Sequence, residues 1–202
     1  MNSKHINSNL ILAQNLTNLY FIAVMPPQKI CEEIRSIQSD FANQFGSSAA
    51  LKVIPHITLK APVKLHALEH ARLLDWFEKL VINIRPFKIE LKNYGCFAHK
   101  EHPVIFIQPV MNDILFTLQK ETARNFGIAY PEIPVRRTEV TFHPHITVAY
   151  KDLTFEKFLE AWEIYKTKTY SSIFEINELH LLQHQQSRWN VIGTNQIGHG
   201  PV

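Results

Sequence analysis

The sequence predicts an α+β fold with an internal duplication, in which two similar lobes pack about a pseudo-twofold axis. Two observations lead to this prediction. Segments with strand-like and helix-like periodicity follow one another in the same order in both halves of the chain. A short sequence, Pro-His-Ile-Thr, also occurs once in each half, at 55–58 and at 144–147.

The first half begins with an apolar run at 20–24 that has the length of a buried strand and is followed by two prolines. Apolar residues then recur at helical spacing over 28–45, and Gly46 stands where a C-terminal cap is expected. The strand with the first Pro-His-Ile-Thr comes next. A helix over about 66–80 and an alternating strand over 87–91 complete this half.

The second half follows the same order. A strand over 104–107 leads into a helix over about 112–126, which again ends in Phe followed by Gly. After the second Pro-His-Ile-Thr come a helix over about 154–165, with Thr154 as its N-cap, and a strand over 174–176 that echoes 87–89. The interval from the first strand to the histidine is 35 residues in one half and 39 in the other. This agreement supports the duplication.

Composition places the chain among ordinary globular proteins. Of its 202 residues 46% are hydrophobic and 19% are charged, and a net charge of +3 permits an anionic ligand without requiring a long nucleic acid. Cys31 and Cys96 show no disulfide or metal-ligand spacing, so we expect a reduced, cytoplasmic protein. Because no apolar run reaches the length of a membrane span, we expect no membrane partner. We expect a flexible tail at 1–18 before a single bilobal, monomeric domain at 19–202.

The repeated Pro-His-Ile-Thr predicts an acid–base pair. Side chains alternate along a strand, so His56 shares a face with Thr58 and with Lys60 if the strand continues, and His145 shares a face with Thr147. One imidazole can act as a base and the other as an acid near neutral pH. The hydroxyl groups can stabilise negative charge on a phosphate without a metal. Displacement at phosphorus needs groups on opposite sides, so we expect the two strands to face each other.

Other interpretations of these residues remain open. His143 and His145 share a strand face and could belong to a metal-dependent hydrolase, although no carboxylate or cysteine accompanies them. The histidines could also be core residues held by backbone hydrogen bonds, or belong to a nucleotide-binding module without turnover. The complete duplication favours catalysis. Phe142 and Tyr94 are candidates for stacking on a base, although burial is the commoner fate of aromatic side chains.

The two His-x-Thr sequences, together with the opening Phe-Ile-Ala-Val and its Pro-Pro, resemble the 2H phosphoesterase superfamily. The resemblance is greatest to its 2′-5′ RNA ligases and RNA 2′,3′-cyclic phosphodiesterases, and it covers Tyr20 to Ile197. It implies two antiparallel sheets flanking a central cleft, with helices on the outside. It also implies an RNA-processing phosphodiesterase that acts on an RNA end or a small nucleotide and needs no cofactor or metal.

The resemblance further implies individual roles. His145 would activate water, His56 would protonate the leaving 3′ oxygen, and Thr58 and Thr147 would donate hydrogen bonds to the phosphate. After the first copy the chain departs from familiar members, which place an aromatic residue and a glycine there. Lys60 begins this different segment and is a candidate phosphate contact.

Overall fold

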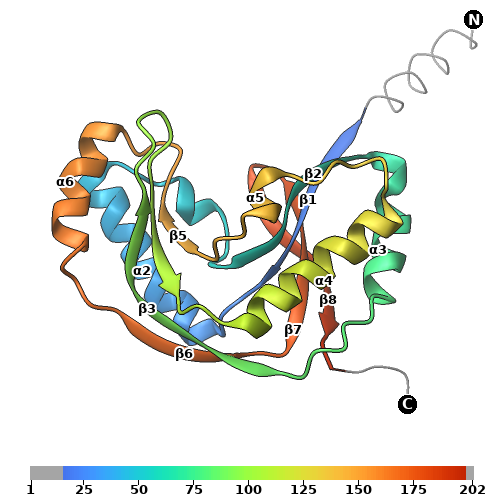
Figure 1. Cartoon of the computed structure of the whole chain (residues 1–202). Coiled ribbons are helices and arrows are strands. Elements are labelled where there is room, and N and C mark those ends of the chain that lie inside the picture. The colour runs from blue at the N-terminus through green and yellow to red at the C-terminus, as the bar shows by residue number, and fades with distance from the viewer. Residues whose placement is uncertain (1–15, 199–202) are drawn as a thin grey trace, which may run out of the picture.

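In a computed structural model, which describes residues 16–198, the chain forms two four-stranded antiparallel sheets (Figure 1). Sheet A has the order β2-β1-β7-β8 and sheet B the order β5-β4-β3-β6. The strands of sheet A are β1 (Thr17–Val24), β2 (Ile57–His66), β7 (Glu178–Gln185) and β8 (Arg188–Gln196). Those of sheet B are β3 (Phe87–Phe97), β4 (Val104–Pro109), β5 (Ile146–Ala149) and β6 (Ser171–Ile176).

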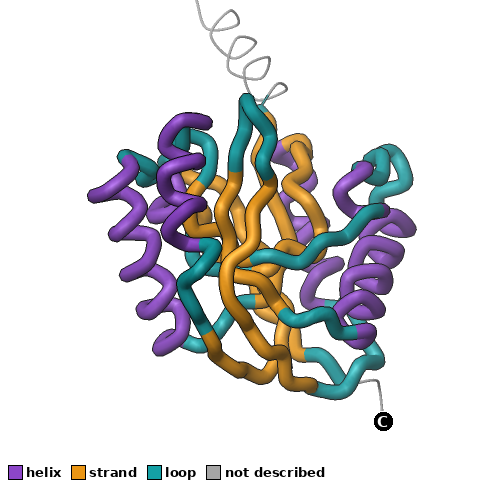
Figure 2. Tube along the Cα trace, turned by 60° about the vertical axis from the view of Figure 1, so that its left-hand side comes forward, coloured by secondary structure: helices purple, strands orange, loops and turns teal. Residues whose placement is uncertain are grey.

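The long helices cover the outer faces of the two sheets, and the strands lie between them (Figure 2). Sheet B carries α2 (Gln28–Phe45) and α6 (Phe155–Tyr165), and sheet A carries α3 (His70–Glu78) and α4 (Asp113–Ala129). The short helix α5 (Arg137–Val140) precedes β5, and 3-10 turns occupy Ala49–Lys52 and Ala67–Glu69. The predicted class, α+β with two antiparallel sheets and external helices, is therefore confirmed.

The duplication is also present, but the lobes exchange helices. By order and place, β1-α2-β2-α3 corresponds to β4-α4-β5-α6. Helix α2 follows a strand of sheet A and packs on β5 of sheet B, whereas α4 follows a strand of sheet B and packs on β2 of sheet A. Each lobe is thus completed by a helix from the other half of the duplication.

The expected equivalence of 87–89 and 174–176 is wrong. These segments belong to β3 and β6, which are neighbours in sheet B and pair antiparallel, with Ile89 opposite Phe174. Their similar sequences reflect the alternation that one sheet face imposes on adjacent strands. By its place in the other sheet, the counterpart of β3 is β7.

Strand β1 is apolar along most of its length because both of its faces are covered. Tyr20, Ile22 and Val24 join the main core, whereas Phe21 and Ala23 join a smaller cluster on the opposite face. The smaller cluster faces the space between the sheets. A strand buried on both faces has no reason to alternate, and this explains its continuous apolar run.

The helix ends follow local signals in most cases. Helix α2 has the predicted bounds, and Gly46 closes it in the left-handed conformation with φ 71°. Thr154 caps α6 by accepting a hydrogen bond from the Lys157 amide at 3.3 Å. Gly127 is not a cap, however, because α4 continues through it to Ala129. None of the helices within residues 16–198 combines the length and hydropathy that a membrane crossing requires.

Strand pairing moves two predicted boundaries. Strand β2 runs to His66, where a helix was expected to begin, and α3 starts only at His70. Strand β1 begins at Thr17, inside the expected tail, and Thr17 pairs with His66. Pairing between the two strands therefore lengthens β1 at its start and β2 at its end, and no local sequence pattern reveals this pairing. The rest of the expected tail, 1–15, lies outside the described residues.

Candidate active site

The structure brings both His-x-Thr sequences into one cavity of about 290 Å³ between the sheets. His56 immediately precedes β2 and His145 immediately precedes β5, so the two histidines occupy corresponding places in the duplication. Thr58 and Thr147, on those strands, line the same cavity. The four side chains that the sequence predicts to act together therefore converge.

The two imidazoles are oriented in the same way. Nδ1 of His56 lies 2.7 Å from the carbonyl oxygen of Ile54, and Nδ1 of His145 lies 2.8 Å from that of His143. A carbonyl oxygen only accepts, so each Nδ1 carries the hydrogen and donates it. In the neutral state each Nε2 then has a free lone pair, and no hydrogen bond within residues 16–198 occupies it. The same atom can donate once the ring is protonated.

Aromatic rings hold both imidazoles in place. The Phe21 ring lies 4.7 Å from that of His56, and the rings of Phe97 and Phe106 lie 5.2 and 5.4 Å from that of His145, measured between centroids. Gly95 makes room for Phe106, because a Cβ atom at this position would clash with the Phe106 ring. The position of His145 thus depends on a close packing contact between two neighbouring strands.

Burial keeps both histidines neutral. It lowers the pKa of His56 from 6.5 to about 4, and the nearby charge of His145 acts in the same direction. Burial also lowers the pKa of His145, although the hydrogen bond to the His143 carbonyl opposes this effect. At pH 7 both rings are therefore uncharged in the free protein, and each can accept a proton.

Lys60 does not contact this cavity, contrary to the expectation that it shares the face of His56. Its Nζ lies 2.7 and 2.9 Å from the two carboxylate oxygens of Glu139, and both side chains are 3% exposed. The pairing of β1 with β2 shifts register between Thr58 and Lys60, which marks a bulge that breaks the simple alternation. The charge of Lys60 is neutralised inside the protein.

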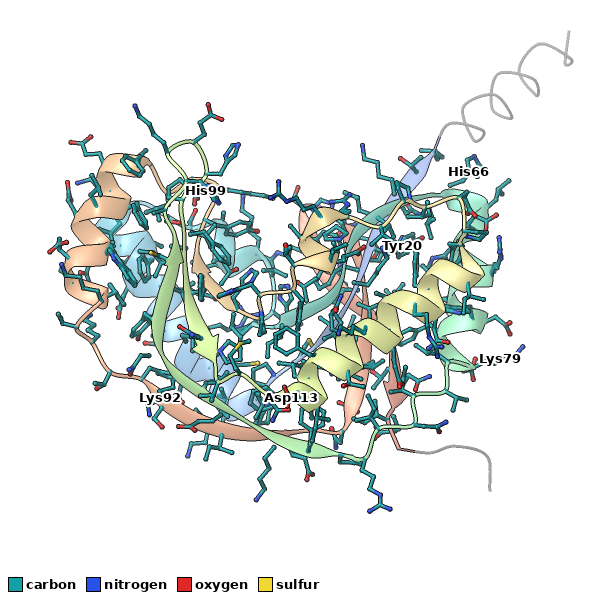
Figure 3. The ribbon with its side chains drawn as sticks, viewed as in Figure 1. Tyr20, His66, Lys79, Lys92, His99 and Asp113 are labelled. Atoms are coloured by element: carbon teal, nitrogen blue, oxygen red, sulfur yellow. The ribbon has the colours of Figure 1, made fainter. Side chains whose placement is uncertain are left out.

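A second cavity, of about 510 Å³, adjoins the first and shares Thr58 and His145 with it. It lies between α5 and the hairpin of β3 and β4, whose loop carries His99 (Figure 3). Phe142, one of the two aromatic residues predicted to stack on a base, lines this cavity. The other, Tyr94, lines neither cavity and packs against Tyr165 of α6 with the ring centroids 5.0 Å apart. Tyr94 is thus a packing residue.

His143 also lines the larger cavity, and its exposed ring packs against Phe97 and Phe106 at 5.3 and 5.7 Å. Within residues 16–198 no cluster of three or more His, Cys, Asp or Glu side chains is arranged to hold a metal ion. The described part of the chain therefore offers no third His, Cys, Asp or Glu ligand to the pair His143 and His145.

Comparison with known proteins agrees with this arrangement. The profile of the 2′-5′ RNA ligase superfamily matches residues 26–188. The chain belongs to the 2′-5′ RNA ligase superfamily. Among curated relatives, the Bacillus pumilus protein named "Putative phosphoesterase" is 24% identical over 181 residues, which cover 89% of this chain and 97% of that protein. A Bacillus cytotoxicus protein of the same description is 24% identical over 182 residues, covering 89% and 96%.

Solved structures share the fold. LigT of E. coli, complexed with 3′-AMP, superposes with a TM-score of 0.58 at 15% identity, covering 91% of this chain and all of that one. TT0787 of Thermus thermophilus gives a TM-score of 0.57 at 16% identity, covering 89% and 98%. The fold shared with these structures therefore extends over nearly the whole chain.

Seven further residues line the smaller cavity and were not among the predicted site residues; they include Phe21, Tyr150, Lys151 and Trp189. The Trp189 ring stands edge-on to that of Phe21 at 4.6 Å and comes from β8, a strand that the sequence pattern did not predict. Tyr150 and Lys151 follow the second His-x-Thr closely. Proximity in sequence to His145 was the one signal that could have identified them.

Proposed function

We propose that the protein is a metal-independent phosphoesterase that hydrolyses 2′,3′-cyclic phosphate ends of RNA, or related cyclic or 2′-5′-linked nucleotides. The observation that carries the proposal is the convergence of two identically oriented imidazoles and two threonine side chains in one cavity. Membership of the superfamily supports the reaction class. Solved structures of E. coli LigT are complexes with 3′-AMP, with NADP+ and with ATP, which supports a nucleotide substrate.

The proposed reaction is an in-line displacement at phosphorus. Nε2 of His145 removes a proton from water as the water oxygen bonds to phosphorus, and the bond from phosphorus to the 3′ oxygen breaks. His56 gives its proton to that oxygen. The product is a 2′-phosphate with a free 3′ hydroxyl. The roles of base and acid are those that the resemblance to the superfamily implies.

Binding of the substrate favours protonation of the acid, and the proton that Nε2 of His56 takes up comes from solvent water. Both imidazoles are neutral in the free protein, but the negative charge of a bound phosphate raises the pKa of a nearby imidazole. Thr58 and Thr147 can donate to the phosphate oxygens, because no hydrogen bond to another described residue occupies their hydroxyl groups. These two hydroxyl groups are then already in position to stabilise the negative charge that develops on the phosphate oxygens in the transition state.

We assign the larger cavity to the nucleoside. Its lining includes the aromatic side chains of Phe97 and Phe142, and it opens onto the phosphate site at His145. The face of an aromatic ring can stack on any nucleobase, whatever the RNA sequence. Phe142 is therefore retained as a stacking residue, and Tyr94 is not.

Hydrolysis of 2′,3′-cyclic AMP, and of a short RNA with a 2′,3′-cyclic phosphate end, tests the proposal. We expect turnover in the presence of EDTA, a 2′-phosphate product by phosphorus NMR, and loss of about a hundredfold or more in kcat for His56→Ala and for His145→Ala. His102→Ala is the matched control, because this exposed histidine lines neither cavity.

Three results would contradict the proposal. Loss of activity with EDTA would indicate a metal-dependent hydrolase. Full activity in both histidine variants would exclude the acid–base pair. Binding of 2′-AMP without turnover of either substrate would identify a nucleotide-binding module.

A further inference from the structure

The turn that follows β5 has an unusual backbone at Lys151. Its φ is 57°, in the left-handed region that residues other than glycine, asparagine and aspartate rarely adopt. A hydrogen bond of 2.7 Å from the Asp152 amide to the Tyr150 carbonyl closes the turn around it. Such strain persists only where the surrounding structure enforces it, and it occurs preferentially at functional sites.

Asp152 enforces this turn. Its carboxylate accepts hydrogen bonds from the amides of Ser48 and Ala49, each at 2.9 Å, and from the hydroxyl of Ser47 at 2.9 Å. Ser47–Ala49 precede His56 in the chain, whereas Asp152 follows His145. These bonds therefore tie the turn to the segments that carry both His-x-Thr sequences, and they fix Lys151 relative to both histidines.

The ammonium group of Lys151 is available to a ligand. Lys151 lines the smaller cavity, and its Nζ lies 5.2 Å from the centre of the Tyr150 ring. No ion pair or side-chain hydrogen bond within residues 16–198 involves it. Lys60, by contrast, is neutralised by Glu139. Among the described residues that line this cavity, Lys151 alone has a side chain that is charged at neutral pH whatever the state of the histidines.

We propose that Lys151 binds the phosphate of the substrate and supplies the permanent positive charge of the site. This inference rests on the proposed function, because it takes an anionic phosphate as the occupant of the cavity. The two histidines are neutral before binding and the threonines are uncharged donors, so an anion entering the cavity meets its one permanent cation at Lys151. The left-handed turn places Lys151 in the lining of the cavity.

Calorimetric titration of inorganic phosphate and of 2′-AMP at pH 7 tests the inference without requiring turnover. We expect Lys151→Met to bind both probes roughly tenfold or more weakly, the cost of one charge-assisted hydrogen bond. Lys151→Arg should keep most of the affinity. Lys88→Met, at an exposed lysine of β3 that lines neither cavity, is the matched control and should bind as the wild type does.

Lys151→Gly separates the effect of the ammonium charge on phosphate binding from the effect of the backbone conformation on stability. It removes the ammonium group and also relieves the left-handed strain, so we expect the affinity of Lys151→Met together with a Tm at or above that of the wild type. A lowered Tm together with normal phosphate affinity would show that Lys151 serves only the turn.

The outcomes distinguish this inference from the proposed function. Hydrolysis by the wild type, with equal phosphate affinity in the wild type and Lys151→Met, overturns the inference alone. Phosphate binding that Lys151→Met loses, in a protein that hydrolyses neither cyclic substrate, supports the inference and overturns the proposed function. The inference also fails if the wild type binds neither probe, or if Lys88→Met loses as much affinity as Lys151→Met.

Discussion

Replacing His56 with glutamine tests whether the cavity holds its imidazole neutral. Burial lowers the pKa of His56 from 6.5 to about 4, so between these values the unfolded chain binds a proton that the folded chain does not. The free energy of unfolding therefore falls as the pH falls through this window, and the loss is complete below pH 4. A pKa difference of about 2.5 corresponds to about 3 kcal/mol, of which about 2 kcal/mol is lost between pH 7 and pH 5. Access of water from the cavity makes these figures upper limits.

Urea denaturation at pH 7, 6 and 5 measures the effect. Because His56→Gln has no group to titrate at this position, its loss of stability between pH 7 and pH 5 should be smaller than that of the wild type by up to about 2 kcal/mol. His145 has a lowered pKa as well, so the wild type and His56→Gln should both still lose some stability. His102→Gln, the exposed control, should keep the wild-type pH dependence. Parallel curves for the wild type and His56→Gln would refute the reasoning.

Three further changes test the supporting structure. Gly95→Ala should displace Phe106, lower the free energy of unfolding by about 1–3 kcal/mol and reduce kcat. Gly127→Ala is its control, because an added Cβ at Gly127 meets nothing within 4 Å. Equal stability of the two variants would contradict the packing argument. Lys60→Met should cost about 3–5 kcal/mol by leaving the buried Glu139 carboxylate without its cation. The double change with Glu139→Leu should recover only part of this cost in urea denaturation, because the Ala61 and Arg136 amides lose their acceptor. A cost below about 1 kcal/mol would show that the pair is not desolvated. Phe142→Ala should raise the KM for an RNA end about tenfold with little change in kcat, because one stacking contact with the base is lost. An unchanged KM would show that the larger cavity does not bind the substrate.

Much of the fold could be predicted because its signals are local. Helical spacing over 28–45 and the glycine after it define α2 within the chain itself, and Thr154 defines the start of α6. Alternation along a strand likewise places Thr58 on the face of His56. These features depend on residues a few positions apart, which the sequence displays directly.

The errors arose where a distant partner decides the local structure. Lys60 lies two positions beyond Thr58, yet a bulge against β1 and a carboxylate 79 positions away take its side chain out of the site. Tyr94 and Phe142 are both aromatic and are equally plausible stacking residues from the sequence, but Tyr94 packs against Tyr165 of α6 at the edge of the core. Lys151 was not predicted because its position depends on Asp152 and the serines that hold the turn.

By itself the sequence determined the α+β class, the duplication, and the residue types that one His-x-Thr strand can present. Only the tertiary structure decided that the two copies meet, which way their imidazoles point, and which lysine stands beside them. The physical reason is one of distance along the chain. Backbone preferences and side-chain alternation act between near neighbours, whereas convergence, burial and the pKa values that burial sets depend on elements that fold together from opposite ends of the chain.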